Sequence, residues 1–163
     1  MRKRLNAHIT WPEREVAQAE RALAHVICES PIWREKDDLL CTVPEIGSGL
    51  ARTLIVNLPE LGTLSRKQIA AIVGVAPLNR DSGTLRGKLT VRGGRAHVRA
   101  ALFMAALVGA RYNPVIRSFY QRLCDAGKAK KVALTACVRS LLTILNAMVK
   151  HRTRWGTNEI ICP

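Results

Sequence analysis

The sequence predicts a mainly α-helical protein in which a helical arm precedes one compact helical domain. Apolar residues recur at helical spacing along most of the chain, helix-start and helix-stop residues bracket these stretches, and strand-like alternation is short. The chain has 163 residues, 48% of them hydrophobic, which is enough to bury one core. We expect the arm over residues 1–38, the domain over 39–150 and a loosely ordered tail over 151–163.

The arm is expected to begin as a helix near residue 10. Thr10 and Glu13 form a T-x-x-E capping box, and Pro12 would be tolerated in a first helical turn. Apolar residues at seven-residue spacing, with others between them, form a short coiled-coil-like seam: Ile9, Val16, Ala19, Leu23 and Val26. The seam fits an arm that packs on another protomer or on the rest of a longer protein, and it fits a surface helix of this domain equally well.

A helical hairpin is expected next. Ser30 and Pro31 separate the arm from a helix that should carry apolar residues into the core: Ile32, Trp33, Leu39 and Leu40. The following V-P-E-I-G-S-G-L-A, residues 43–51, resembles the hairpin of helix-hairpin-helix DNA-binding modules. Gly47 and a capping Ser48 would present backbone N–H groups to a phosphate. Glu45 stands where that motif has its first glycine and would weaken the contact, so a purely structural hairpin is an equal alternative.

The remaining helices have clear start and stop signals. Ser65 and Gln68 form a capping box for a short helix that Gly74 ends. Residues 96–111 are apolar nearly all round, which predicts a central core helix without a solvated face. Asn113-Pro114 begins a further helix that Gly127 ends, and the last helix should span about 130–150.

The segment from Pro77 to Ala100 is the candidate functional region. It contains four glycines and six cations against one acid, Asp81, so it predicts a glycine-rich basic loop, or a small β-hairpin around Gly87-Lys88 within residues 85–92. The cations are candidate phosphate contacts: Arg80, Arg86, Lys88, Arg92, Arg95 and Arg99. Ser82 is the one serine within this cationic stretch, although a serine in D-S-G is in isolation typical of a turn.

The charge balance predicts a polyanionic partner. The chain carries 26 Lys and Arg against 12 Asp and Glu, a net charge of +14. Nucleic acid fits this excess better than an anionic membrane, because no basic amphipathic helix dominates the sequence and the most apolar run, 100–110, is too short to span a bilayer. Nine of the 12 acids lie in the first 60 residues, so the basic half cannot supply a carboxylate cluster for Mg²⁺, and no cofactor is expected within this chain.

The five cysteines predict a reducing environment. They lie at residues 28, 41, 124, 137 and 162, without a C-x-x-C pair. This spacing indicates reduced, mostly buried thiols in a cytoplasmic protein rather than a zinc site.

Several sequence blocks in order resemble a known family. These are V-P-E-I-G, then L-G-T-L-S-R-K-Q-I-A-A-I-V-G-V-A-P-L-N-R-D-S-G-T-L-R-G, then G-G-R-A-H-V-R-A-A-L-F-M-A-A-L-V, N-P-V-I-R-S-F-Y-Q-R-L and G-K-A-K-K-V-A-L-T-A-C-V-R. From about residue 39 to 150 the chain is similar to the C-terminal domain of RNA-guided insertion-sequence transposases of the IS110/IS116 type. These join a RuvC-like acidic domain to a serine-bearing domain.

The resemblance implies a DNA recombinase in which Ser82 attacks a DNA phosphodiester. It also implies DNA, a guide RNA and other protomers as partners, no membrane partner, and Mg²⁺ held only by the acidic domain. That domain is absent from this sequence, so we expect a truncated or separately encoded transposase. Arg80, Arg86 and Lys88 would supply the positive field that activates a serine hydroxyl.

Alternative roles remain open at the sequence level. His97 could transfer a proton or contact a phosphate, but a helix-start position favours a structural or DNA-contact role. Tyr112 and Tyr120 lie in apolar helical stretches, which favours packing in the core or at an interface over nucleophilic catalysis. The rival function is a non-catalytic helix-hairpin-helix-type nucleic-acid-binding module, and a decayed gene product without activity is a third hypothesis.

Overall fold

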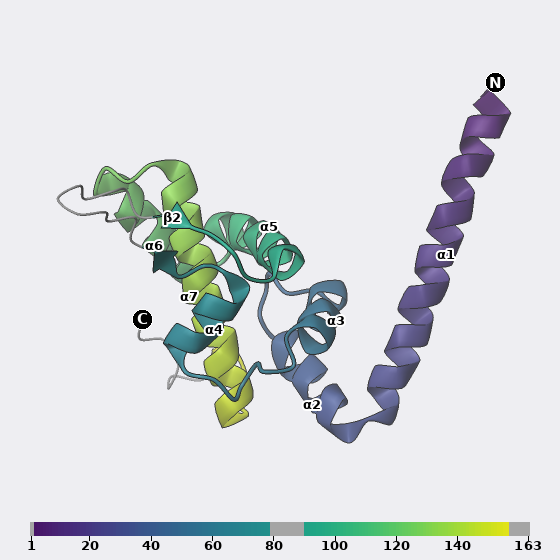
Figure 1. Cartoon of the computed structure of the whole chain (residues 1–163), viewed down its shortest axis with the longest axis horizontal. Helices are drawn as coiled ribbons and strands as arrows, with labels where there is room; N and C mark the ends of the chain where they lie inside the picture. The colour runs from purple at the N-terminus through teal and green to yellow at the C-terminus, as the bar shows by residue number, and fades with distance from the viewer. Residues whose placement is uncertain (1, 79–89, 157–163) are drawn as a thin grey trace.

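The computed structural model describes residues 2–78 and 90–156, and this part of the chain is mainly helical, as expected. It contains helices and one pair of short strands, shown in Figure 1. In chain order they are α1 (Arg2–Glu29), α2 (Pro31–Leu40), α3 (Ser48–Asn57), α4 (Arg66–Val73), β1 (Pro77–Leu78), β2 (Thr90–Val91), α5 (Ala96–Tyr112), α6 (Pro114–Asp125) and α7 (Lys130–His151).

The arm is a single long helix that projects from the globular part of the molecule (Figure 1). The expected start at Thr10 is wrong, because α1 begins at Arg2 and Pro12 lies inside it. A proline removes one hydrogen bond of the helical ladder, and the strong helix formers on both sides carry the helix through it. The break at Ser30 is confirmed, with Pro31 in the first turn of α2.

The core of the globular part is built around α7, which packs against α5, α6, α4 and α2. Its buried residues are Ala133, Cys137, Val138, Leu141, Leu142, Leu145, Asn146, Met148 and Val149. The same helix is, within the described residues, the one helix long and apolar enough to cross a bilayer. Burial in the core already accounts for this composition, so the finding does not indicate a membrane protein.

The expectation of a fully enclosed α5 is wrong in part. Three residues at four-residue spacing, Met104, Val108 and Tyr112, are 59%, 43% and 77% exposed and form one solvated stripe. The opposite face of α5 enters the core through Leu102 and Ala106. An apolar sequence therefore did not distinguish the face that packs from the face that does not.

The same correction applies to other apolar side chains that were expected in the core. On α2, Leu39 and Leu40 are buried, but Ile32 is 66% exposed and Trp33 38%. Thiols were expected to be mostly buried, but Cys28 and Cys41 are exposed, whereas Cys137 is buried. Only the tightly packed centre of the molecule therefore covers its apolar residues completely.

Most of the predicted helix boundaries are confirmed by their caps. The Ser65 side chain accepts a hydrogen bond from the Gln68 backbone and the capping box is complete, while Gly74 ends α4 with φ 77°. The Asn113 side chain accepts from the Val115 N–H at 3.0 Å at the start of α6. Gly127, with φ 76°, follows the end of α6. These local rules fixed where the helices begin and end.

Two segments depart from the expected detail. β1 and β2 pair antiparallel, with Pro77 opposite Val91 and Leu78 opposite Thr90. This ladder joins the ends of the basic loop; residues 85–89 of the expected hairpin lie outside the described residues. In the expected loose tail, the Trp155 N–H donates to Thr42 Oγ1 at 3.1 Å, so residues up to 156 turn back toward the core.

Candidate nucleic-acid interface

The basic loop begins and ends at the β1–β2 ladder. Four of its predicted site residues, Arg80, Ser82, Arg86 and Lys88, lie outside the described residues. Their assignments as phosphate contacts and nucleophile therefore stay predictions. Arg92, directly after β2, is described and exposed.

Two glycines, one before β1 and one after β2 in the chain, bring the end of α4 against the start of α5. Gly74 and Gly94 both have positive φ, 77° and 69°. A Cβ atom on Gly94 would collide with the backbone of residues 72–74, and one on Gly74 would collide with the backbone of Gly93. The Arg95 N–H donates to the Ile72 carbonyl at 3.0 Å across this contact. Only glycine permits both the backbone conformation and the close approach.

Arg95 connects the start of α5 to the end of α3 and the segment that follows it. Its guanidinium donates to both carboxylate oxygens of Glu60 at 2.6 Å and to the Asn57 carbonyl at 2.8 Å. Such two-pronged pairing is the strongest side-chain contact available to arginine. The hydrogen bonds from Arg95 hold the pKa of Glu60 at about 2, below its usual value of 4.5.

Arg99 completes this arrangement one helical turn further along α5. Its guanidinium donates to the Val73 carbonyl at 3.1 Å and to the Gly93 carbonyl. We call Glu60, Gly74, Gly94, Arg95 and Arg99 the loop anchor. Arg95 and Arg99 were predicted to bind phosphate. In the described structure the Arg95 guanidinium binds Glu60 and the Asn57 carbonyl, and the Arg99 guanidinium joins Val73, before the ladder, to Gly93, after it.

The start of α3 is an open helix N-terminus. Gly47 is the N-cap residue, and Ser48 is the first helical residue, not the cap that was expected. Both are exposed, and no side chain caps the helix. The space beside Gly47 and Gly49 is empty to 4 Å. The first backbone N–H groups of α3 therefore face outward, where an anion can approach them.

Glu45 does not oppose this helix N-terminus in the way its position in the motif suggested. Its carboxylate accepts hydrogen bonds from the Asn113 side chain at 2.9 and 3.1 Å. Asn113 is only 1% exposed, and Gly109 leaves room for the carboxylate beside α5. Burial raises the pKa of Glu45, and the Asn113 hydrogen bonds partly offset that rise. This inward contact ties the α2–α3 turn to the start of α6.

The sequence did not reveal that Asn113 is the partner of Glu45. The sequence signal, Asn before Pro at a helix start, correctly predicted its capping role. Its oxygen caps α6 while its amide group binds Glu45, so one buried side chain performs both tasks. The second task joins residues 68 positions apart, which no local pattern indicates.

The other candidates for chemistry lie apart from the loop anchor or carry no supporting contact. His97 is exposed on the first turn of α5. Tyr112 is 77% exposed at the end of α5, so it does not pack in the core, and packing at an interface stays a prediction for it. Tyr120 packs partly against the core, as expected, and a hydrogen bond with Cys124 raises its pKa.

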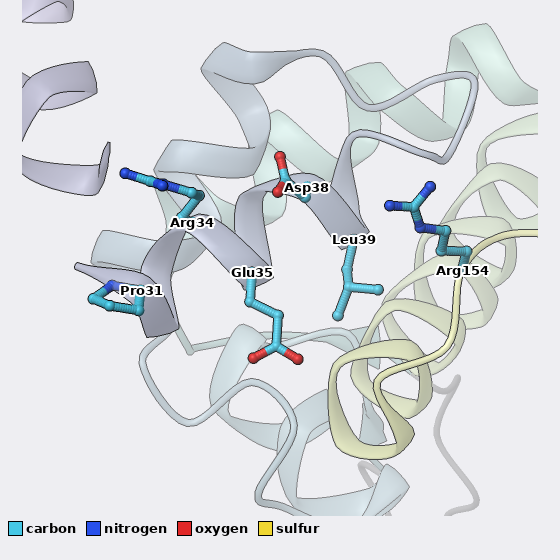
Figure 2. A pocket seen from close by; sticks show the side chains of 6 residues that line it. All are labelled: Pro31, Arg34, Glu35, Asp38, Leu39 and Arg154. Atoms are coloured by element: carbon cyan, nitrogen blue, oxygen red, sulfur yellow. The ribbon is translucent and has the colours of Figure 1, made fainter. Parts of the chain in front are cut away.

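A shallow hollow of about 370 Å³ lies between α2 and the chain after α7 (Figure 2). Figure 2 shows that its charged side chains diverge: Glu35 and Asp38 point to different sides, and Arg154 lies across the hollow from Arg34. Arg34 is held by the Cys28 carbonyl. The hollow brings no reactive groups together, so the open surface is the better candidate site.

No group of His, Cys, Asp and Glu in the described part of the chain could hold a metal ion. The Glu60 carboxylate is bound by Arg95, and the Glu45 carboxylate is bound by Asn113. What the described residues offer is an excess of basic over acidic residues and two fixed backbone features, the open start of α3 and the anchored ends of the basic loop.

Comparison with known proteins identifies a family for this chain. Residues 37–121, slightly more than half of the chain, match the family described as Transposase IS116/IS110/IS902. The chain belongs to this family. The match covers α3, α4, the basic loop, α5 and most of α6, so the anchored loop is part of the family's shared region.

Several curated relatives match over longer or shorter stretches. The pilin gene-inverting protein of Moraxella bovis is 31% identical over 146 residues, which are 86% of this chain and 45% of that protein. An uncharacterized 43.6 kDa protein of insertion element IS110 from Streptomyces coelicolor is 30% identical over 71% of this chain and 29% of its own length. An uncharacterized 42 kDa protein of insertion element IS900 from Mycobacterium paratuberculosis is 36% identical over 88 residues. The chain thus spans less than half the length of these relatives.

Proposed function

We propose that this protein acts in DNA transposition as the DNA-gripping and strand-breaking domain of a recombinase. Membership of a transposase family is the observation that carries the proposal, because the matched region includes the basic loop with Ser82. The name of the Moraxella relative, a gene-inverting protein, describes a rearrangement of DNA. The net charge of +14 supports DNA as the partner, since phosphate contacts by Lys and Arg dominate such binding.

The DNA-binding part of the proposal uses the two fixed features of the surface. The open N-terminus of α3 at Gly47 and Ser48 offers backbone N–H groups to one phosphate. The loop anchor holds the two ends of the basic loop at a defined spacing, which the β1–β2 ladder extends by two residue pairs. Arg92 and the loop cations then contact neighbouring phosphates.

The chemical part of the proposal assigns the nucleophile to Ser82. Its Oγ attacks a DNA phosphorus, forming a phosphoserine ester while the bond from phosphorus to a deoxyribose oxygen breaks. The serine proton passes to that oxygen, which leaves as a hydroxyl. A hydroxyl of another DNA end then attacks the ester, rejoining DNA and regenerating the serine. Loop cations stabilise the charge on the phosphoryl oxygens.

Partners beyond DNA are part of the same proposal. A guide RNA and protomers that carry an acidic, Mg²⁺-binding domain follow from the resemblance in sequence. The exposed seam of α1, with Ile9 and Val16 each 57% exposed, supports self-association through the arm.

Trapping of the covalent intermediate tests the proposal. A nicked duplex substrate, incubated with the protein and with a transposase protomer that supplies the acidic domain, should give a protein–DNA adduct on denaturing gels. Ser82→Ala should lose the adduct and keep its DNA affinity. Ser118→Ala, on α6, removes a hydroxyl that bonds only the Val115 carbonyl in the described structure, and it should keep the adduct.

The rival hypothesis, a non-catalytic binding module, predicts no adduct with either the wild-type protein or Ser82→Ala, with the same DNA affinity for both. Absence of both adduct and strand joining, with the acidic domain supplied in trans, would favour a decayed product. An adduct that persists in Ser82→Ala would move the nucleophile to another residue and contradict the proposed mechanism.

A further inference from the structure

A second group of cations lies where α6 turns into α7, separate in sequence from the basic loop. We call Arg117, Arg122, Lys128, Lys130 and Lys131 the corner cluster. All five are exposed, and the one acid on the same stretch is Asp125. From residue 90 to 156 the sequence has 13 Lys and Arg against this single acid, and five of the 13 lie on these 15 residues.

The corner cluster has no acidic partners within residues 2–78 and 90–156. The ion pairs of that part of the chain are His25 with Glu29, Arg95 with Glu60, and Arg152 with Glu35. At the other end of α7, Arg152 thus has a carboxylate within 3.5 Å, whereas Lys130 and Lys131 have none. Glu35 on α2 thus pairs with a cation at the C-terminal end of α7, whereas the cations at the N-terminal end of α7 have no such carboxylate.

Without a bound anion, the positive charges at the start of α7 lower the stability of the folded chain. The N-cap residue is Ala129, which provides no capping side chain, and the first turn contains no acid. The starts of α4 and α6 are capped by Ser65 and Asn113. Two lysines at the positive end of a helix are disfavoured by the helix dipole. A bound anion would reverse this penalty, so the arrangement suits a ligand better than it suits stability.

The chemistry of the corner cluster favours a duplex backbone over unstacked bases. Proteins that bind single strands stack bases on exposed aromatic rings. The exposed aromatic residues of the described structure are Trp11, Trp33 and Tyr112, and none of them lies on α6 or α7. Phe119 is covered by the Arg122 guanidinium, 5.2 Å from the ring centre, which orients that cation.

We propose that the corner cluster is a second DNA-binding surface, which contacts the sugar-phosphate backbone of double-stranded DNA apart from the start of α3. Figure 1 shows the α6–α7 turn and the start of α3 on different sides of the globular part. The proposal rests on the proposed function in taking DNA as the partner. It adds that the protein can grip DNA at two places, which a reaction that joins two DNA segments requires.

Salt-dependent binding of a random-sequence 30-base-pair duplex, followed by fluorescence anisotropy, tests the proposal. Lys130→Gln with Lys131→Gln should lower the slope of log K against log salt by about 1.8, since each phosphate contact contributes about 0.9. The affinity should fall on the order of tenfold near 0.1 M salt. The matched control, Arg139→Gln with Lys150→Gln, removes two exposed cations further along the same helix and should leave the slope near that of the wild type.

Charge reversal separates a lost contact from a damaged fold. Lys130→Glu with Lys131→Glu places acids at the positive end of α7, so the melting temperature should rise by about 2–4 °C. The same variant should bind the duplex more weakly than the glutamine variant. Binding and stability are thus expected to change in opposite directions, which misfolding cannot produce.

Three outcomes would overturn the proposal. An unchanged salt slope in both Lys130/Lys131 variants would show that the corner cluster does not contact DNA. An equal decrease of the salt slope in the Arg139/Lys150 control would show that only the net charge of the protein matters. Weakened binding of a single-stranded RNA with unchanged duplex binding would assign the surface to RNA. The Ser82→Ala adduct assay is independent of these results, so failure of the proposed mechanism remains distinguishable.

Discussion

The two longest described helices, α1 and α7, differ in what covers their apolar residues. Among the described side chains of α1 only Ile27 is buried, at 1% exposure, while Trp11 is 66% exposed. α7 is shorter, and nine of its 22 residues are buried. Both helices carry apolar residues at helical spacing, and both were predicted as helices from that pattern.

The difference shows that periodicity identifies an apolar face without identifying its partner. Among the described helices, four pack on α7, whereas α1 contacts only α2 and α3 and then projects outward (Figure 1). A helix draws most of its stability from packing of its apolar face. The seam of α1 therefore calls for a partner from outside the globular part, and a second copy of this chain, as proposed above, would supply one.

The largest expected difference between the two helices is in the effect of shortening an apolar side chain. Leu142→Ala on α7 should lower the free energy of unfolding by about 2–5 kcal/mol, because the side chain is fully buried and a cavity remains. At a protein concentration low enough to keep the chain monomeric, Val16→Ala on α1 should change it by less than about 0.5 kcal/mol. Urea denaturation followed by tryptophan fluorescence gives both values. A similar loss in the two variants would mean that α1 is packed in solution.

Local sequence signals were sufficient for most helix boundaries and insufficient for contacts between elements. Ser65, Gly74 and Asn113 were identified from residue type and spacing because caps act over four residues. The start of α1 failed by the same logic, since a local capping pattern at Thr10 is weaker than the helix propensity of the residues before it.

For the candidate site, the sequence revealed the charge and the glycines but not the loop anchor. Arg95 and Arg99 resembled free phosphate contacts because nothing nearby in sequence engages them. Their partners, Glu60 and the Val73 carbonyl, lie 35 and 26 residues away and are brought close by the packing of α4 against α5. Glu45 was expected to weaken a phosphate contact at the helix N-terminus for the same reason, and its partner Asn113 lies 68 residues away.

The pH dependence of stability should distinguish the ion-paired Glu60 of the globular part from an exposed acid on α1. The pKa of Glu60 is held at about 2 in the folded chain, against its usual 4.5, by Arg95. Because the folded pKa is the lower one, the ion pair stabilises the fold fully above pH 4.5, and its contribution is lost as the pH falls toward 2. Glu60→Gln should therefore flatten the loss of stability over this window.

Glu20→Gln on α1 is the matched control, because Glu20 is exposed and has no ion pair in the described part of the chain. Its melting temperature between pH 2 and 5 should follow that of the wild type. Differences between variants are the proper measurement, since burial raises the pKa of Glu45 and gives a pH dependence of opposite sign. Identical profiles for Glu60→Gln and the wild type would show that the loop anchor does not depend on its ion pair.

The smallest expected effect on stability is in the seam of α1, where the change should instead alter association. Ile9→Asp with Val16→Asp should leave the melting temperature at low protein concentration unchanged, because both side chains are more than half exposed. Light scattering after size exclusion should show a shift toward the monomer, since a charge in an apolar seam opposes coiled-coil pairing. The control, Arg14→Asp with Gln18→Asp, adds acids to the opposite face of the helix and should leave the oligomer intact. If both pairs of substitutions dissociate the oligomer, or neither does, α1 is not the surface through which the copies meet.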